Sequence, residues 1–239
     1  MKIAIIGYGK MGHEVEKAAL ARQHEVAVTI DNAQEWEERL EKLKQADVAI
    51  DFSQPDRVVG NIHRCFDLHI PIVVGTTAWQ DHFEEIKQRC LAEKQSLFTA
   101  PNFSIGMNIM FLLNKQLARF AERYGYQLSL SETHHIHKLD KPSGTAVKLA
   151  NDILSVNHDY DRWSIDAPAD HTLYIEAKRE GEVFGIHSVT ASSPADSITI
   201  THQAFNRQGF ALGAIAAAEF LVEKTGCFGM EDLFGSPQP

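Results

Sequence analysis

The fold is decided by residues 1–15, MKIAIIGYGKMGHEV. The apolar run from Ile3 to Ile6 is typical of a strand that is buried on both faces of a parallel sheet. It leads directly into the pattern Gly7-x-Gly9-x-x-Gly12. Glycines at this spacing permit a tight turn, a close approach of the backbone to a pyrophosphate and close packing of the following helix. The stretch therefore predicts a dinucleotide-binding loop between a strand and a helix.

An acidic residue stands at the place where such a loop needs one. A helix is expected from about Met11 to Gln23 and a strand over EVAVTID, which ends at Asp31, nineteen positions beyond Gly12. A carboxylate at about this distance hydrogen-bonds the adenosine ribose in dinucleotide-binding proteins. The alternative is that Asp31 only begins a turn with Asn32.

The remainder of the first hundred residues alternates between helical and strand patterns. Helices are expected over 33–45, 55–69 and 80–95, and strands over 46–52, 70–77 and 96–101. Strands that alternate with helices at this spacing form a parallel sheet with right-handed crossovers. Residues 1–104 are therefore predicted to be an α/β domain, a Rossmann-type doubly wound parallel sheet that binds a dinucleotide.

Two further strand ends carry groups that suit a ligand, which in doubly wound sheets binds at the carboxyl ends of the strands. The sequence GTT at 75–77 offers backbone and hydroxyl groups for a nicotinamide ribose. In APNFS, at 100–104, Asn102 and Phe103 are placed to orient the nicotinamide ring. An ordinary turn explains GTT equally well.

A second domain is expected over 105–207, because the hydrophobic pattern changes there. One helix is predicted over 107–124, with an apolar stripe through Ile109, Leu112, Leu113, Leu117 and Phe120. Beyond it the period becomes two, which predicts strands over 126–135, 171–180, 183–192 and 196–205 and a hairpin turn at 179–181. The pattern indicates an α+β domain built on a mixed or antiparallel sheet.

The end of the chain is strongly apolar. Residues 210–225, FALGAIAAAEFLVEKT, are apolar almost all round until Glu219, so the helix they predict must be buried. We expect a C-terminal helix within 208–239 that packs back on the first domain.

The stretch ETHHIHKLDKPSGTA, residues 132–146, concentrates groups that can carry chemistry. Its histidines and Lys138 are able to hold, donate or release protons near neutral pH, and the lysine can also pair with a carboxylate. Ser143 is placed to cap the next helix, whose free N–H groups at Gly144 and Thr145 form an anion site. The alternatives are a cluster that serves packing or a zinc site. The absence of a nearby cysteine and the charge of Lys138 disfavour a metal, and none is expected.

The composition excludes several classes of protein. A formal charge of -9 over 239 residues argues against non-specific binding of nucleic acid. No apolar run is long enough to span a membrane, and the N-terminus has no targeting pattern, so a cytoplasmic protein is expected. The three cysteines follow neither a disulfide nor a zinc spacing; Cys65 and Cys90 fall within predicted helices and are expected to pack.

In sequence, the chain resembles the 4-hydroxy-tetrahydrodipicolinate (dihydrodipicolinate) reductase family of bacterial lysine and diaminopimelate biosynthesis. The resemblance rests on ETHHIHKLDKPSGTA and on GYGKMG, GTT, APNFSIGMN and AFNRQGFALGA in the same order, and it covers essentially the whole chain. One departure is the glycine loop, which is one residue shorter than the family's usual G-x-x-G-x-M-G.

The resemblance implies an oxidoreductase that reduces a dicarboxylate ring with NADH or NADPH. It makes His134 a catalytic proton donor or acceptor, Lys138 the proton donor and His135 a substrate ligand. Ser143, Gly144 and Thr145 would hold a ring carboxylate. The implied cofactor-binding residues are Gly7, Tyr8, Gly9, Lys10, Met11, Gly12, Asp31, Gly75, Thr76, Thr77, Ala100, Pro101, Asn102 and Phe103.

Finer properties follow from the same resemblance. NADH is expected to be preferred, with NADPH tolerated, since Asp31 favours an unphosphorylated ribose. A homotetramer joined through the sheets of the second domain is also expected. Two other functions stay open: another two-domain Rossmann dehydrogenase of amino-acid biosynthesis, such as an aspartate-semialdehyde-type enzyme with a cysteine nucleophile, or a non-catalytic module that senses nicotinamide cofactors.

Overall fold

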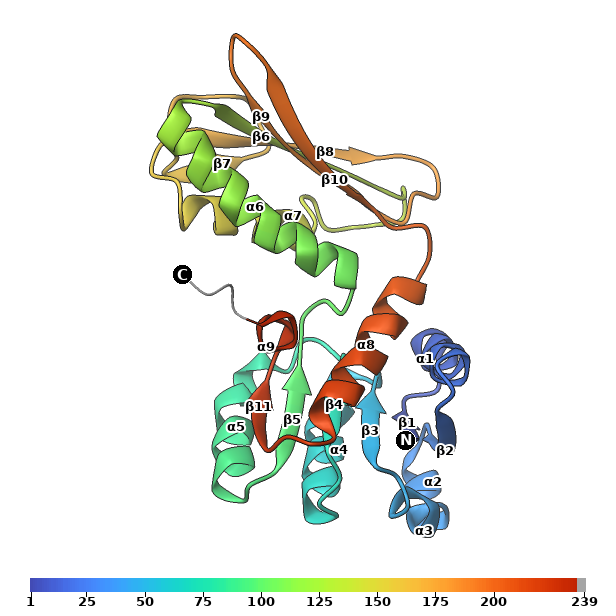
Figure 1. Cartoon of the computed structure of the whole chain (residues 1–239). Coiled ribbons are helices and arrows are strands. Elements are labelled where there is room, and N and C mark those ends of the chain that lie inside the picture. Colours follow the sequence, from blue (N-terminus) through green and yellow to red (C-terminus); the bar gives the residue numbers. More distant parts are fainter. Residues whose placement is uncertain (236–239) are drawn as a thin grey trace. The chain divides into compact units, whose positions relative to one another are not determined.

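A computed structural model describes residues 1–235 of the chain, which divides into two compact units. Unit 1 comprises residues 1–105 and the segment that begins at Arg207, and unit 2 comprises Gly106–Asn206. Figure 1 shows the first unit in blue to green and red, and the second in green to orange. The chain therefore leaves the first unit and returns to it.

Unit 1 is built on a six-stranded parallel sheet. The strand order is β11-β5-β4-β3-β1-β2, so the direction of winding reverses between β1 and β3. This confirms the predicted Rossmann-type, doubly wound sheet, and the reversal is the point at which such sheets bind their ligands. The strands are β1 Lys2–Ile6, β2 Glu25–Ile30, β3 Val48–Asp51, β4 Ile72–Val74, β5 Ser96–Thr99 and β11 Gly226–Phe228.

Helices cover both faces of this sheet, because successive residues of its strands point to opposite sides. Ile3 and Ile5 of β1 join a core with α1 and α8, while Ala4 and Ile6 join a second core with α4 and α5. Both faces are thus apolar, as a continuous hydrophobic strand predicts. The helices of unit 1 are α1 Lys10–Ala21, α2 Ala33–Glu38, α3 Leu40–Leu43, α4 Pro55–Asp67, the 3-10 helix η1 Gln80–His82, α5 Phe83–Ala92, α8 Gln208–Leu221 and α9 Met230–Phe234.

The C-terminal segment differs from the single helix predicted within 208–239. Helix α8 packs in the first core, but it ends at Leu221 and is followed by strand β11 and helix α9. Strand β11 extends the sheet beside β5 (Figure 1). Its three residues are too few to show a period in the sequence. The predicted range also includes residues 236–239, which lie outside the described residues.

Unit 2 is built on a five-stranded mixed sheet in the order β10-β9-β6-β8-β7. Strand β6 pairs parallel with β8 and antiparallel with β9, which confirms the predicted mixed sheet. The predicted hairpin at 179–181 is wrong, because β6 lies between β8 and β9. The strands are β6 Gln127–His134, β7 Arg162–Ser164, β8 Thr172–Arg179, β9 Ile186–Ser192 and β10 Ser197–Gln203.

Helices α6, Ile105–Tyr124, and α7, Gly144–Leu154, supply the other side of the unit 2 core. The apolar stripe predicted for α6 is partly wrong, since Ile109, Leu113 and Phe120 are exposed. The helix is apolar on more than one face, and periodicity alone does not tell which face packs. The buried face carries Met107, Met110, Phe111, Ala118 and Ala121.

Candidate active site

The glycine loop of unit 1 has the geometry that a phosphate-binding turn requires. Gly7 has a φ of +85°, and a Cβ there would lie 2.4 Å from the carbonyl oxygen of Phe52. At Gly9, by contrast, a Cβ would meet nothing within 4 Å. Helix α1 begins at the next residue, Lys10, with no side chain capping its N-terminus. The open backbone at the start of this helix therefore fits a cofactor pyrophosphate.

Asp31 ties the end of strand β2 to this loop. Its Oδ1 accepts a hydrogen bond of 2.8 Å from the backbone N–H of Tyr8. Asn32 caps helix α2, since its side chain accepts from the N–H of Glu35 at 3.1 Å. A hollow of about 360 Å³ adjoins Asp31 and is lined by Asn32, Arg57 and Arg64 among others. The local turn, which Asn32 caps, is therefore compatible with a ribose-binding role for Asp31.

A buried aspartate that the sequence analysis did not single out holds the GTT turn in place. Asp51, at the end of β3, accepts a hydrogen bond of 2.6 Å from Thr76 Oγ1 and one of 2.8 Å from Asn61 Nδ2. Burial raises the pKa of the Asp51 carboxyl, and hydrogen bonds from Thr76, Ser53 and Asn61 offset part of that rise. The Thr76 hydroxyl is therefore engaged with the protein, whereas Thr77 is exposed.

The segment 100–103 is largely structural. Phe103 is 2% exposed, and its ring packs near those of Phe52 and Phe98, with centroid distances of 6.0 and 5.9 Å. Asn102 Oδ1 accepts a hydrogen bond of 2.9 Å from the N–H of Ser104. Any contact that Phe103 makes with a cofactor would thus come from its backbone. Ala100 is buried as well, while Pro101 is exposed.

In unit 2, the end of strand β6 carries a hydrogen-bonded chain of charged groups. The His134 Nδ1 bonds the Oε2 of Glu132, and the other oxygen of Glu132 accepts a bond of 2.9 Å from Arg179 Nη1. Glu132 is 1% exposed. Burial alone would raise the pKa of this carboxyl, but the bonds from His134 and Arg179 outweigh burial and lower the pKa to about 2. Glu132 is therefore ionised at neutral pH.

Ser143 and His187 complete this group. Ser143 caps helix α7 as predicted, because its Oγ accepts from the N–H of Ala146 at 3.2 Å. The same hydroxyl shares a hydrogen bond of 3.2 Å with His187 Nε2, and the Ser143 N–H donates to Glu132 at 3.3 Å. Burial, and then the nearby His134, lower the pKa of His187 to about 3, so its ring is neutral at pH 7.

Lys138 lies beside an acidic residue in the loop that follows. Its Nζ is 2.8 Å from Asp140 Oδ1, and the pKa of Asp140 is lowered first by Lys138 and also by the backbone N–H of Gly144. A carboxylate thus already sits between the lysine and the start of helix α7. The buried Nδ1 of His135 has no hydrogen-bond partner within residues 1–235.

The ligand-type atoms of Glu132, His134 and His187 lie within 4.8 Å of one another, which is a spacing that a metal ion can use. The Arg179 guanidinium, however, is bonded to Glu132, and a fixed positive charge disfavours a second cation there. The absence of a metal stays a prediction.

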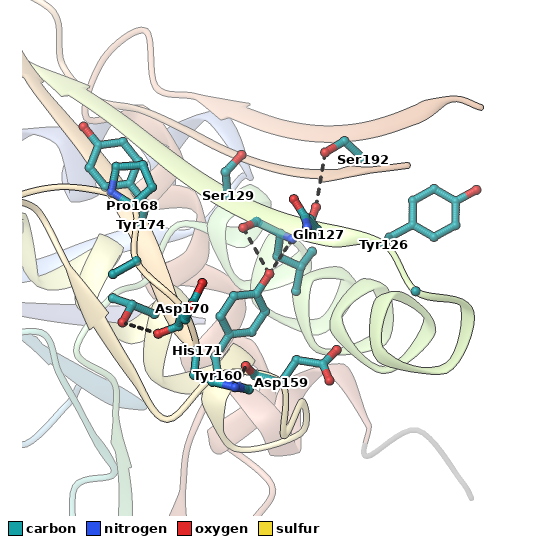
Figure 2. Close-up of a pocket in the computed structure, with 14 residues that line it drawn as sticks. Tyr126, Gln127, Ser129, Asp159, Tyr160, Pro168, Asp170, His171, Tyr174 and Ser192 are labelled. Carbon is teal, nitrogen blue, oxygen red and sulfur yellow. Dashed lines mark hydrogen bonds between the residues drawn. The ribbon is translucent and has the colours of Figure 1, made fainter. Parts of the chain in front are cut away.

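A larger hollow of unit 2, about 670 Å³, contains none of the predicted site residues. It lies at the opposite end of β6 from His134 and is lined by Tyr126, Gln127 and Tyr160 among others (Figure 2). The Tyr160 hydroxyl accepts from the N–H of Leu128 at 2.7 Å, so this tyrosine serves the fold.

Four residues of the two sites were not predicted from the sequence: Glu132, Arg179, His187 and Asp51. Glu132 stands two residues before His134 on the same strand face, which is a signal that the sequence did contain. The other pairings depend on strand register. Glu132 stands opposite His187 on β9, and His134 stands opposite Arg179 on β8. That register joins residues far apart in the chain.

Together the two units define a class of protein. The Rossmann-type unit with its glycine turn is typical of dinucleotide-binding proteins, and the second unit brings histidines and a lysine together, which indicates a nicotinamide-dependent oxidoreductase. No helix within residues 1–235 combines the length and the apolar character that a membrane crossing requires.

Comparisons with known proteins identify the family within this class. Residues 1–103 match the family described as "Dihydrodipicolinate reductase, N-terminus", and residues 106–234 match "Dihydrodipicolinate reductase, C-terminus". The 4-hydroxy-tetrahydrodipicolinate reductase of Christiangramia forsetii is 43% identical over 234 residues, 98% of this chain and 97% of the relative. That of Neisseria gonorrhoeae is 34% identical over 201 residues, 81% of this chain and 74% of the relative. The chain belongs to the dihydrodipicolinate reductase family.

Solved structures agree on the fold. A dipicolinate-bound dihydrodipicolinate reductase from Paenisporosarcina sp. TG-14 matches with a TM-score of 0.78 at 24% identity, covering 97% of this chain and 98% of the other. Aspartate semialdehyde dehydrogenase II from Vibrio cholerae matches with a TM-score of 0.53 at 12% identity, covering 92% and 98%. The second likeness is one of fold, and Cys65 and Cys90 lie buried within helices α4 and α5 of this chain.

Proposed function

We propose that this chain reduces 4-hydroxy-tetrahydrodipicolinate to tetrahydrodipicolinate with NADH or NADPH, in the biosynthesis of diaminopimelate and lysine. The observation that carries the proposal is the 43% identity with a reductase of this name over 98% of the chain. The two sites support it, because one fits a dinucleotide and the other combines proton-transfer groups with an anion site.

The substrate carboxylate would bind at the start of helix α7. Ser143 fixes the first turn through its cap, and Gly144 and Thr145 present backbone N–H groups. Asp140 supports this role, because its own carboxylate is already stabilised by Lys138 and by Gly144. A substrate carboxylate would take over these two partners. His135, whose buried Nδ1 lacks a partner within residues 1–235, is placed to add a further bond.

Proton transfer would be shared between His134 and Lys138. The substrate first loses its 4-hydroxyl group as water, and the resulting conjugated imine then accepts a hydride, which the nicotinamide supplies when bound. The product of that transfer is electron-rich and must be protonated, and both side chains are able to act as general acids. Holding the ring by its carboxylate would also lower the activation barrier by several kcal/mol, because the reacting groups are already oriented.

The cofactor would bind along the glycine loop, Asp31 and the turns 75–77 and 100–103. NADH is the preferred form in this proposal, because the Asp31 carboxylate would repel a 2′-phosphate. NADPH would still bind, since Arg57 lies on the same hollow and donates to the backbone oxygen of Asp31 at 3.3 Å. An Asp31→Asn variant should narrow the difference between the two Michaelis constants.

The deciding experiment couples this protein to dihydrodipicolinate synthase, which makes the unstable substrate in place. Oxidation of NADH and of NADPH is followed by absorbance at the wavelength of the reduced nicotinamide. We expect both cofactors to be consumed only when the synthase product forms. If neither is consumed, the proposed function is wrong. In that event a cofactor-sensing module gains weight, for which His134→Ala and Lys138→Ala would change nothing.

Two properties of the whole enzyme complete the proposal. We infer a homotetramer that forms through the unit 2 sheet, where edge strand β10 has mainly exposed residues. Sedimentation velocity tests it, and a monomer at micromolar concentration would contradict it. A cytoplasmic location is proposed too, and cell fractionation tests it.

A further inference from the structure

The catalytic imidazole proposed above is held by a carboxylate whose purpose the fold alone does not explain. Glu132 is 1% exposed, and burying an ionised carboxylate is costly unless it is fully paired. Here three donors surround it: the His134 ring, the Arg179 guanidinium at 2.9 Å and the Ser143 N–H at 3.3 Å. Two of the three belong to the proposed substrate site itself.

The pairing fixes which nitrogen of His134 carries the proton. An ionised carboxylate only accepts hydrogen bonds, so Nδ1 must be the donor to Glu132. The other nitrogen, Nε2, then has its lone pair available when the ring is neutral and a second proton when it is charged. This is the state that a general acid or base requires.

The surroundings of Nε2 are consistent with this arrangement. The Nε2 side of the ring lies against Gly185, where an added Cβ would be only 2.9 Å from Nε2. The His187 ring meets His134 edge to face at a centroid distance of 5.0 Å, which limits rotation of the imidazole. Both observations restrict the ring to one orientation.

The charges around the imidazole come from every neighbouring element. Glu132 on β6 is bonded to it directly, and Arg179 on β8 neutralises that carboxylate. His187 on β9 faces the ring and interacts electrostatically with His202 on β10. Lys138 forms an ion pair with Asp140 in the following loop. Glu132 is the carboxylate among them that contacts the imidazole.

We propose that Glu132, anchored by Arg179, is a positioning residue for His134: it sets the tautomer and the direction of the ring and stabilises the protonated form during turnover. This inference depends on the proposed function, in which His134 transfers a proton. Glu132 itself does not contact the substrate in this proposal.

The first test is the Glu132→Gln variant, which keeps the shape of the side chain and removes its charge. Because the variant loses a charge-assisted hydrogen bond to His134, we expect kcat to fall roughly 10- to 100-fold. The Michaelis constant for NADH should be unchanged. The protonated ring also loses its carboxylate, so the pH midpoint of the His134-dependent limb should move to lower pH. Glu176→Gln, at a half-exposed ion pair on β8, is the matched control and should leave both unchanged.

A double-mutant cycle separates positioning from a general structural role. In a His134→Gln background, Glu132→Gln should cause little further loss, because its effect passes through the imidazole. Losses that multiply, or a loss in kcat without a pH shift, would overturn the inference. If His134→Gln itself has normal turnover, the proposed role of His134 fails first, which is a distinguishable result.

A measurement on the unaltered protein does not depend on whether the variants fold. Ring ¹⁵N chemical shifts of His134 report its tautomer, and the neutral ring should carry its proton on Nδ1. A neutral ring with its proton on Nε2 would contradict the proposal, whatever the activity of the variants.

Discussion

Acidification should cost this protein stability through Glu132. The pKa of this carboxyl is about 2 in the folded protein against an ordinary value of 4.5, because the bonds from His134 and Arg179 outweigh the effect of burial. Well above pH 4.5 the carboxylate is ionised in both states and its stabilising effect is complete. Between pH 4.5 and 2 the unfolded chain binds a proton that the folded protein does not, so the free energy of unfolding falls.

The size of this effect follows from the interval between the two pKa values. One pH unit corresponds to about 1.4 kcal/mol, so the interval from 4.5 to about 2 corresponds to about 3 kcal/mol. Denaturant unfolding of the wild-type protein and of Glu132→Gln, at a series of pH values from 2 to 7, measures it. Fluorescence of Trp163 in unit 2 reports on the relevant unit when Trp36 and Trp79 are replaced by Phe in both proteins.

The informative quantity is the difference in unfolding free energy between the two proteins, since the other acidic groups cancel. It should be largest above pH 5 and shrink by about 3 kcal/mol toward pH 2. A difference that is flat over this range would refute the reasoning. Glu176→Gln provides the comparison, because its half-exposed pair with Lys178 should change the curve by less than about 1 kcal/mol.

Three further predictions concern unit 1. Gly213→Ala should lower the free energy of unfolding by about 3 kcal/mol or more, because the new Cβ would lie 1.7 Å from the Phe103 carbonyl oxygen; Gly60→Ala, where a Cβ meets nothing within 4 Å, should be neutral or stabilising in the same denaturation assay. Gly7→Ala should weaken NADH binding at least tenfold by fluorescence titration, because the turn needs its φ of +85°, and unchanged affinity would contradict this. Alkylation with iodoacetamide at pH 7.5 should leave turnover intact, because burial raises the pKa of each thiol; rapid inactivation would instead favour a cysteine nucleophile among Cys65, Cys90 and Cys227.

The sequence is most informative where a pattern is local. The run Ile3–Ile6 and the glycines after it predict a buried strand and a turn, and the structure has both, with alternate residues of β1 in the two cores. Ser143 is likewise recognised as a cap from its neighbours, and it caps α7. In each case the determining contacts lie within a few residues, so the signal is complete in the sequence.

Patterns that fit two faces or too few residues give weaker predictions. Helix α6 is apolar on more than one side, and the stripe that contains Ile109 and Leu113 is the exposed one. Strand β11 has three residues and no period, so the sequence predicts no strand after the helix of residues 210–225. The hairpin at 179–181 was wrong because turn residues do not show which strands pair.

The site in unit 2 depends both on residues that are adjacent in the sequence and on the register of its strands. Its proton-transfer groups are adjacent in the sequence, but their charges are set by Arg179, which stands opposite His134 in the register of β6 and β8. The same guanidinium donates to the carbonyl oxygens of Lys138 and Asp140. One arginine therefore fixes the carboxylate behind the imidazole and the loop that carries the lysine. Because these two groups share an anchor, a change at Arg179 should disturb both proton donors together, whereas a change at Glu132 should act through His134 alone.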